Sequence, residues 1–77
     1  MPRYFFSTAN GHKVIDSEGD VLPDETAARN MAIDILAEIL PSQRHRLEDG
    51  GRYSVVVAGE DNQAFFEITA TAKRLSV

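Results

Sequence analysis

A single apolar stripe at helical spacing occupies the middle of the chain and limits how the rest can fold. Asp24 is a good helix N-cap, and Pro41 cannot continue the helical hydrogen-bond ladder, so the helix is predicted to end near Leu40. One helix of this length can cover only one face of a sheet. The apolar residues of the stripe recur every three or four positions, which places them on one face of an α-helix: Ala28, Met31, Ala32, Ile35, Leu36, Ile39 and Leu40.

Two pairs of strand-like segments flank this helix. Residues 3–9 and 12–16 form the first pair, and residues 52–58 and 64–72 form the second. The order strand, strand, helix, strand, strand predicts an α+β fold, ββαββ, with a mostly antiparallel four-stranded sheet and one helix packed on one face. The length of the chain fits a single small domain over residues 1–77. The first strand is expected to be central because it is the most aromatic.

The first pair is joined by Asn10-Gly11, which is a strong signal for a two-residue hairpin turn. With a loop of that length, Ser7 is expected opposite Val14, and directly paired residues share a face of the sheet. Val21-Leu22 is expected to add a short extended piece before the helix. After the helix, residues 41–51 are expected to form a polar connection with a short helical turn, and the tail from residue 73 is expected to fray.

Adjacent phenylalanines occur in two of the predicted strands, as Phe5-Phe6 and Phe65-Phe66. Because neighbouring residues of a strand point to opposite faces, one ring of each pair is expected on each face of the sheet. The predicted helix-facing residues are Tyr4, Phe6, Ile15, Tyr53, Val55, Val57, Phe66 and Ile68. The predicted residues of the opposite face are Phe5, Ser7, Val14, Val56, Phe65, Glu67 and Thr69.

Phe5, Val14, Val56 and Phe65 therefore form a predicted apolar patch on the face that the helix leaves uncovered. Two interpretations are open. Either the chain itself covers this face, through the 41–51 connection or the C-terminal tail, or the patch is a contact surface for protein. In the second case a symmetric homodimer is the commonest form, and an unknown protein partner is the other.

No set of residues in the sequence predicts a catalytic, cofactor-binding or metal site, so the protein is expected not to be an enzyme. The absence of cysteine excludes disulfides and thiolate zinc sites. Asp16, Glu18 and Asp20 alternate as the early ligands of a calcium loop do. However, Gly19 is two positions too early for the EF-hand glycine, and Ala27 stands where the bidentate glutamate should be.

A net charge of −4 argues against nucleic acid as a partner, because such binding depends on lysine and arginine contacts to phosphate. An alternative function is a nucleic-acid-binding regulator, in which Arg44, Arg46 and Arg52 form a basic patch beside the aromatic sheet face. The most apolar segment, residues 31–40, is about half the length that spans a bilayer. The N-terminus does not resemble a signal peptide, so a cytoplasmic protein is expected.

Four segments of the sequence carry a resemblance to a known family: MPRYFF, the NG turn, DSEGDVLPDETAARNMA and GEDNQAFFEI. Together they resemble a family of short uncharacterised alphaproteobacterial proteins of the rhizobial type, which begin M-P-R-Y-F-F and have an L-P-D…A-A-R helix start. Ser7 stands where many members carry histidine, and Asn10-Gly11 replaces Asp-Gly. The resemblance implies a soluble bacterial protein and supplies no activity, cofactor or catalytic residue.

Overall fold

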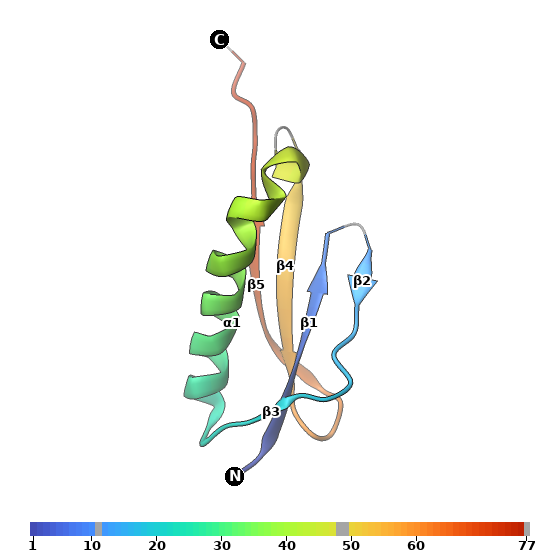
Figure 1. Ribbon diagram of the computed structural model, residues 1–77, viewed down its shortest axis with the longest axis vertical. Helices are drawn as coiled ribbons and strands as arrows, with labels where there is room; N and C mark the ends of the chain where they lie inside the picture. The colour runs from blue at the N-terminus through green and yellow to red at the C-terminus, as the bar shows by residue number, and fades with distance from the viewer. Residues whose placement is uncertain (11, 48–49, 77) are drawn as a thin grey trace.

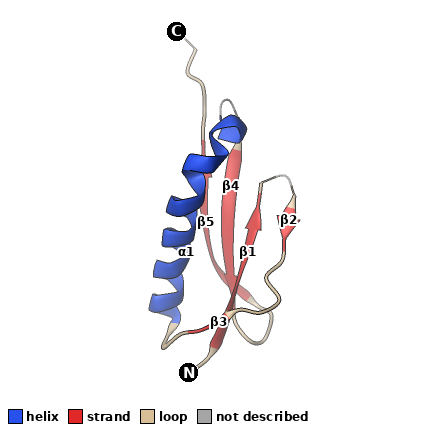
Figure 2. Cartoon of the chain, viewed as in Figure 1, coloured by secondary structure: helices blue, strands red, loops and turns tan. Residues whose placement is uncertain are grey.

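The protein forms two layers, a twisted antiparallel sheet and a helix that lies against one of its faces (Figures 1 and 2). The computed structural model describes residues 1–10, 12–47 and 50–76, the side chain of Arg46 excepted. This architecture confirms the predicted α+β fold and the order of its main elements. The elements of the described residues are β1 (Arg3–Ala9), β2 (Lys13–Val14), β3 (Asp20–Val21), α1 (Glu25–Ile39), the 3₁₀ helix η1 (Leu40–Leu47), β4 (Arg52–Ala58) and β5 (Ala64–Thr71).

The sheet has the strand order β2-β1-β4-β5, and β3 pairs separately with β1. The predicted central place of the first strand is therefore confirmed, because β1 pairs with three other strands. The sheet has five strands rather than the predicted four among the described residues, since the short piece before the helix pairs with Arg3 and Tyr4. All pairings are antiparallel.

The helix α1 begins and ends close to the predicted positions. Asp24 is its N-cap, and its carboxylate accepts a hydrogen bond from the Ala27 backbone N–H at 2.9 Å. The α-helix ends at Ile39, and the chain continues through Pro41 as η1, which includes the predicted turn. The small buried residues Ala28 and Ala32 let the helix approach the sheet closely.

The core lies between α1 and the sheet. Val57 is fully buried, and its row across the sheet joins Phe6 on one side to Phe66 on the other. Burial of apolar area of this kind is the main stabilising term for a small domain without disulfides. The buried apolar residues are Tyr4, Phe6, Ala28, Ala32, Leu36, Tyr53, Val55 and Val57.

The register of the first hairpin differs by one residue from the prediction, which was wrong. Val14 pairs with Thr8 rather than with Ser7. The connection contains one more residue than a two-residue turn, because the Asn10 Oδ1 atom accepts a hydrogen bond from the His12 N–H at 3.2 Å and holds His12 within the loop. The predicted turn residue Gly11 lies outside the described residues. A one-residue shift exchanges the faces of every side chain in β2 and after it.

The described part of the C-terminal tail, as far as residue 76, does not cover the sheet. Gly51 and Ala72 form the last pair beyond β5, with the Ala72 N–H donating to the Gly51 carbonyl at 3.0 Å. From there the described residues lead away from the two layers along the long axis of the molecule, and Leu75 is 75% exposed (Figures 1 and 2). Val77, the other apolar residue of the tail, lies outside the described residues.

Candidate interaction surface

The doubled phenylalanines of β5 lie at a β-bulge. Ala58 pairs with Ala64 and Val57 pairs with Phe66, so Phe65 is an extra residue with no partner in β4. A bulge re-aims side chains and breaks their strict alternation between faces.

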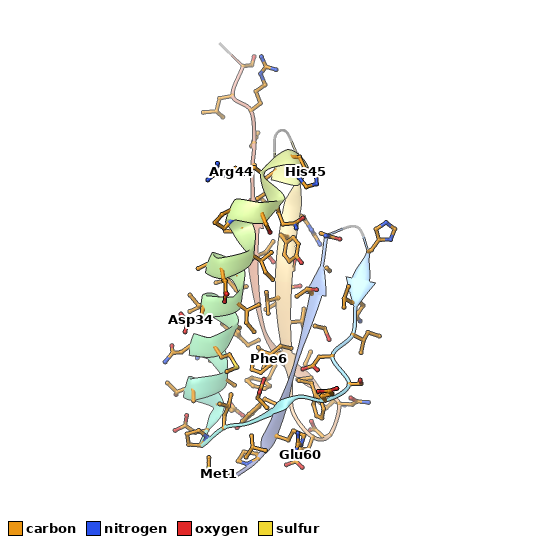
Figure 3. The ribbon with its side chains drawn as sticks, in the orientation of Figure 1. Met1, Phe6, Asp34, Arg44, His45 and Glu60 are labelled. Carbon is orange, nitrogen blue, oxygen red and sulfur yellow. The ribbon has the colours of Figure 1, made fainter. Side chains whose placement is uncertain are left out.

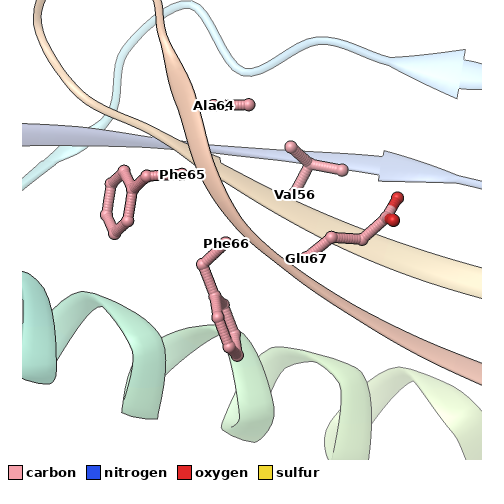
Figure 4. A pocket seen from close by; sticks show the side chains of 5 residues that line it. All are labelled: Val56, Ala64, Phe65, Phe66 and Glu67. Atoms are coloured by element: carbon pink, nitrogen blue, oxygen red, sulfur yellow. The ribbon is translucent and has the colours of Figure 1, made fainter.

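Phe65 consequently lies on the helix side, and its predicted place on the opposite face is wrong. Its ring packs edge-on against the buried ring of Tyr4, with ring centroids 5.9 Å apart and an interplanar angle of 64°. Figure 4 shows Phe66 pointing toward α1, with Ala64 and Glu67 on the other side of the strand. Neither Phe65 nor Phe66 therefore lies on the face opposite α1. Phe65 is still 38% exposed, so part of its ring remains at the surface beside β5.

Phe66 is also held by the helix. The Arg29 guanidinium carbon lies 4.8 Å from the centroid of the Phe66 ring, a cation–π arrangement. This contact places the side of α1 that carries Arg29 over β5. It also explains why Phe66 is half-buried although β5 is the last strand of the sheet.

Phe5 does lie on the face opposite α1, but the chain covers it. The loop that precedes β3 crosses Phe5 so closely that a Cβ atom added to Gly19 would lie 2.9 Å from the Phe5 ring and 2.6 Å from the Tyr4 carbonyl oxygen. Phe5 is consequently half-buried. Among the described residues, the segment that covers Phe5 is this loop, and not the 41–51 connection or the tail that the sequence suggested.

Asp16 anchors the covering loop to β1. One of its carboxylate oxygens accepts a hydrogen bond from the Phe6 N–H at 3.0 Å, and the other accepts from the N–H groups of Glu18 and Gly19, both at 3.1 Å. Burial alone would raise the pKa of the Asp16 carboxyl, but the three backbone donors outweigh burial and hold the pKa below its ordinary value. The carboxylate therefore takes the place of a backbone carbonyl as the partner of the Phe6 N–H, at the part of β1 between its pairings with β2 and β3.

The uncovered part of the opposite face carries aliphatic side chains around a shallow hollow of about 290 Å³. We call this surface the open face. Ile15 is its most prominent member, with 70% of its surface exposed. Sequence reasoning placed Ile15 on the helix side and missed it, because the hairpin register was shifted. The residues that line the hollow are Ser7, Lys13, Ile15, Val56, Ala58, Asn62 and Ala64.

Of the predicted patch, only Val56 lies on the open face at the hollow. Val14 is 64% exposed, but it pairs with Thr8 and so shares a side of the sheet with α1. A second hollow of about 330 Å³ adjoins the first at the bulge and is lined by Val56, Ala64, Phe65, Phe66 and Glu67 (Figure 4).

Comparison with known proteins places the sequence in a family. Residues 3–71 match the family described as "Domain of unknown function (DUF6894)", which is nearly the whole chain. The chain belongs to the DUF6894 family. No curated protein matches the DUF6894 chain, and neither does any solved structure.

The described part of the DUF6894 chain holds no group of three or more histidine, cysteine, aspartate or glutamate residues that could bind a metal ion. None of its described helices is long and apolar enough to cross a membrane.

The predicted basic patch is only partly visible in the DUF6894 structure. Arg44 is exposed on η1 (Figure 3), and Arg52 is exposed at the start of β4. The side chain of Arg46 lies outside the described residues. The nucleic-acid alternative also required exposed rings on the open face, but Phe5 is half-buried and Phe65 lies on the helix side. The stacking platform on which that alternative depended is therefore not formed.

Proposed function

We propose that this DUF6894 protein is a non-enzymatic interaction module that self-associates through the open face of its sheet. The observation that carries the proposal is the exposed Ile15 side chain, which stands beside Val56, Ala58 and Ala64 on a face that α1 does not cover. Contiguous apolar side chains on the surface of a small protein often mark a contact surface. A two-fold dimer buries the same patch on both subunits, so one patch is sufficient.

The charges on the open face support contact with a second copy. Lys13 is exposed beside Ile15, and Glu67 is exposed at the adjoining hollow. Because the surface carries both signs of charge, two copies related by a two-fold axis can place Lys13 of one copy near Glu67 of the other. Such charges orient the contact, whereas the aliphatic side chains supply the favourable free energy.

The composition of the hollow supports a contact role. Four of its seven lining residues are aliphatic, Ile15, Val56, Ala58 and Ala64, and its polar members are Ser7, Lys13 and Asn62. The resemblance of the chain start and of the L-P-D…A-A-R segment to alphaproteobacterial sequences supports a bacterial origin and a role in the cytoplasm.

The proposal is tested by sedimentation equilibrium of the purified protein over a range of concentrations and at two salt levels. A dimer whose affinity changes little with salt is expected, because aliphatic contacts are insensitive to ionic strength. Ile15→Glu should dissociate the dimer, since it places two like charges in the contact.

Val14→Glu is the matched control. It makes the same change at the neighbouring exposed residue, on the other side of the sheet, and should leave the dimer intact. A protein that remains monomeric at high micromolar concentration would contradict self-association, and equal effects of the two substitutions would exclude the open face as its site.

A further inference from the structure

The outer edge of β5 presents backbone groups that β4 does not use. Beyond the strand, the Ala72 N–H donates to the Gly51 carbonyl and the Ala72 carbonyl accepts from the Gly50 N–H, so the backbone of Ala72 faces β4. Residues of an antiparallel pair alternate between facing the partner and facing away. Following this alternation back along β5, Phe66, Ile68 and Ala70 face β4, and the N–H and C=O groups of Glu67, Thr69 and Thr71 point to the free edge.

Beyond Phe66 this edge lacks the proline, lysine and bulge by which proteins usually prevent pairing of exposed strands, and Glu67 is its one charged residue. Natural edge strands are kept very short or carry proline and lysine. β5 has eight residues, AFFEITAT, with neither proline nor lysine. The bulge at Phe65 disrupts only the beginning of the strand and leaves the part after Phe66 regular.

The charge on β5 limits the ways in which two copies of the edge can pair. In an antiparallel pair across a two-fold axis, outward-pointing residues must face one another, so Glu67 faces Glu67, Thr69 or Thr71 of the second copy. Like charges directly opposite each other are destabilising, which excludes the first register. In the register in which Glu67 faces Thr69, Ile68 lies on the axis opposite its own copy.

The helix favours this second register. The chain runs in the same direction in α1 and β5 (Figure 1), and Arg29 lies over Phe66. Ile33 follows Arg29 by about 6 Å along the helix on the same side, and Ile68 follows Phe66 by about 6.6 Å along the strand. Ile33 therefore lies on the β5 side of α1, further along the chain direction than Arg29, and it is 44% exposed. A two-fold axis at Ile68 brings this exposed side chain and the half-buried Ile68 toward their copies.

We propose that the β5 edge is a second, separate association surface, on which another copy of this chain adds its own β5 in the register that places Ile68 on a two-fold axis. The pair of edges forms about four backbone hydrogen bonds between Glu67 and Thr69 of the two copies. The two sheets become one continuous sheet, with both helices on the same side. This inference does not depend on the open-face contact; Glu67 is the one residue named for both surfaces, by its side chain at the open face and by its backbone at the edge.

Cysteine cross-linking tests the register, since the chain contains no cysteine of its own. The Ile15→Glu chain is used as the parent so that the open face does not contribute. Ile68→Cys should form a disulfide-linked dimer under mild oxidation, because directly opposed residues of this type have Cα atoms about 4.5 Å apart, within the disulfide range. Glu67→Cys and Thr69→Cys should cross-link slowly, since each lies on a diagonal of about 7–8 Å.

A proline substitution tests the edge itself. Thr69→Pro removes an outward N–H without removing a bond to β4, and it should raise the dissociation constant of the edge dimer by roughly 100-fold through the loss of two hydrogen bonds. Thr69→Ala is the control, because it also loses the Ser54–Thr69 hydroxyl contact of 3.1 Å but keeps the N–H. Thermal melting of both variants establishes that they fold.

The two variant series separate the two proposals. A dimer that survives Ile15→Glu and is lost in Thr69→Pro supports the edge. A dimer that is unaffected by Thr69→Pro and is lost in Ile15→Glu overturns the edge and supports the open face. Equal cross-linking at residues 67, 68 and 69 overturns the register even if an edge dimer forms.

Discussion

The carboxylate of Asp16 accepts a hydrogen bond from the backbone N–H of Phe6, ten residues away, at 3.0 Å. The same side chain binds the N–H groups of Glu18 and Gly19. One carboxylate thus closes the loop over Phe5 and replaces a missing strand partner for β1. This acceptor group therefore helps to hold the loop over Phe5, together with the Arg3 guanidinium, which donates to the Glu18 carbonyl at 2.8 Å, and the pairing of β3 with β1.

Asp16→Asn should lower the free energy of unfolding by about 1–2 kcal/mol at neutral pH, because the amide replaces one of the two acceptor oxygens with a donor that faces the N–H of Phe6. The folded state holds the pKa of Asp16 below its ordinary value, so its stabilising contribution is present above about pH 4 and is lost as pH falls through the lowered pKa. Urea unfolding of both proteins between neutral and acidic pH measures this. A difference between the two proteins that does not shrink at low pH would contradict the role of the charge.

Gly19→Ala should be more destabilising than Gly50→Ala. Both glycines have positive φ, 71° and 74°, and each substitution therefore carries the conformational cost of about 1–2 kcal/mol. At Gly19 the new methyl group would also lie 2.6 Å from the Tyr4 carbonyl oxygen, whereas at Gly50 nothing lies within 4 Å. The β1 backbone cannot move away easily, so the extra cost should exceed about 1 kcal/mol. Denaturant unfolding of the two variants gives the comparison, and equal losses would show that the loop can move.

The phenol of Tyr4 should titrate above its ordinary pKa. Burial of the ring is the main cause of the raised pKa, and the negative charges of Glu25, Asp24 and Glu60 add to it. Because the folded pKa lies above the unfolded one, the stability that Tyr4 contributes is complete below about pH 10 and is lost as pH rises through the folded pKa. Phenolate absorbance followed in the wild-type and Tyr4→Phe proteins measures this titration, and a Tyr4 signal at the ordinary pKa would contradict the environment described for the ring.

Phe65→Ala should destabilise the fold rather than act only on association. The ring pair with Tyr4 contributes about 0.5–1.5 kcal/mol beyond the area that it buries. Phe65→Leu keeps much of the apolar volume and should recover part of the loss. The free energies of unfolding, measured at a concentration at which the protein is monomeric, check this expectation. No loss of stability in Phe65→Ala would place the ring in solvent.

The helix and the order of the main elements could be predicted because local signals define them. The apolar period, the Asp24 N-cap and Pro41 all act within α1 or next to it. The place of Phe65 could not be predicted by strict alternation, because a single extra residue changes the face of its side chain. Adjacent phenylalanines do not indicate the bulge, because Phe5 and Phe6 of β1 pair regularly with Ala58 and Val57.

Two predictions about the face opposite α1 were wrong, the side of Ile15 and the exposure of Phe5. One error arises from the length of a loop and the other from a contact between residues far apart in the sequence. Ile15 was assigned to the wrong side because the first hairpin contains His12 in its loop, and a shift of one residue exchanges the faces. The cover over Phe5 is held by contacts distant in sequence, among them the bond between Asp16 and Phe6, which joins a turn to the middle of a strand. The D-S-E-G sequence indicates the turn but not its distant partner.

The bulge at Phe65 also determines where the chain can gain or lose a residue. From the Val57–Phe66 pair onward, the ladder between β4 and β5 is regular and continues to Arg52–Thr71. Removal of residue 65 would leave every one of those pairs in place and would join Ala64 directly to Phe66, so that the bulge and the ring contact with Tyr4 are lost while residues 59–63 keep their number. A change in length at this one position of β5 therefore keeps the register of the ladder, whereas a deletion after Phe66 would turn the apolar residues of the strand out of the core.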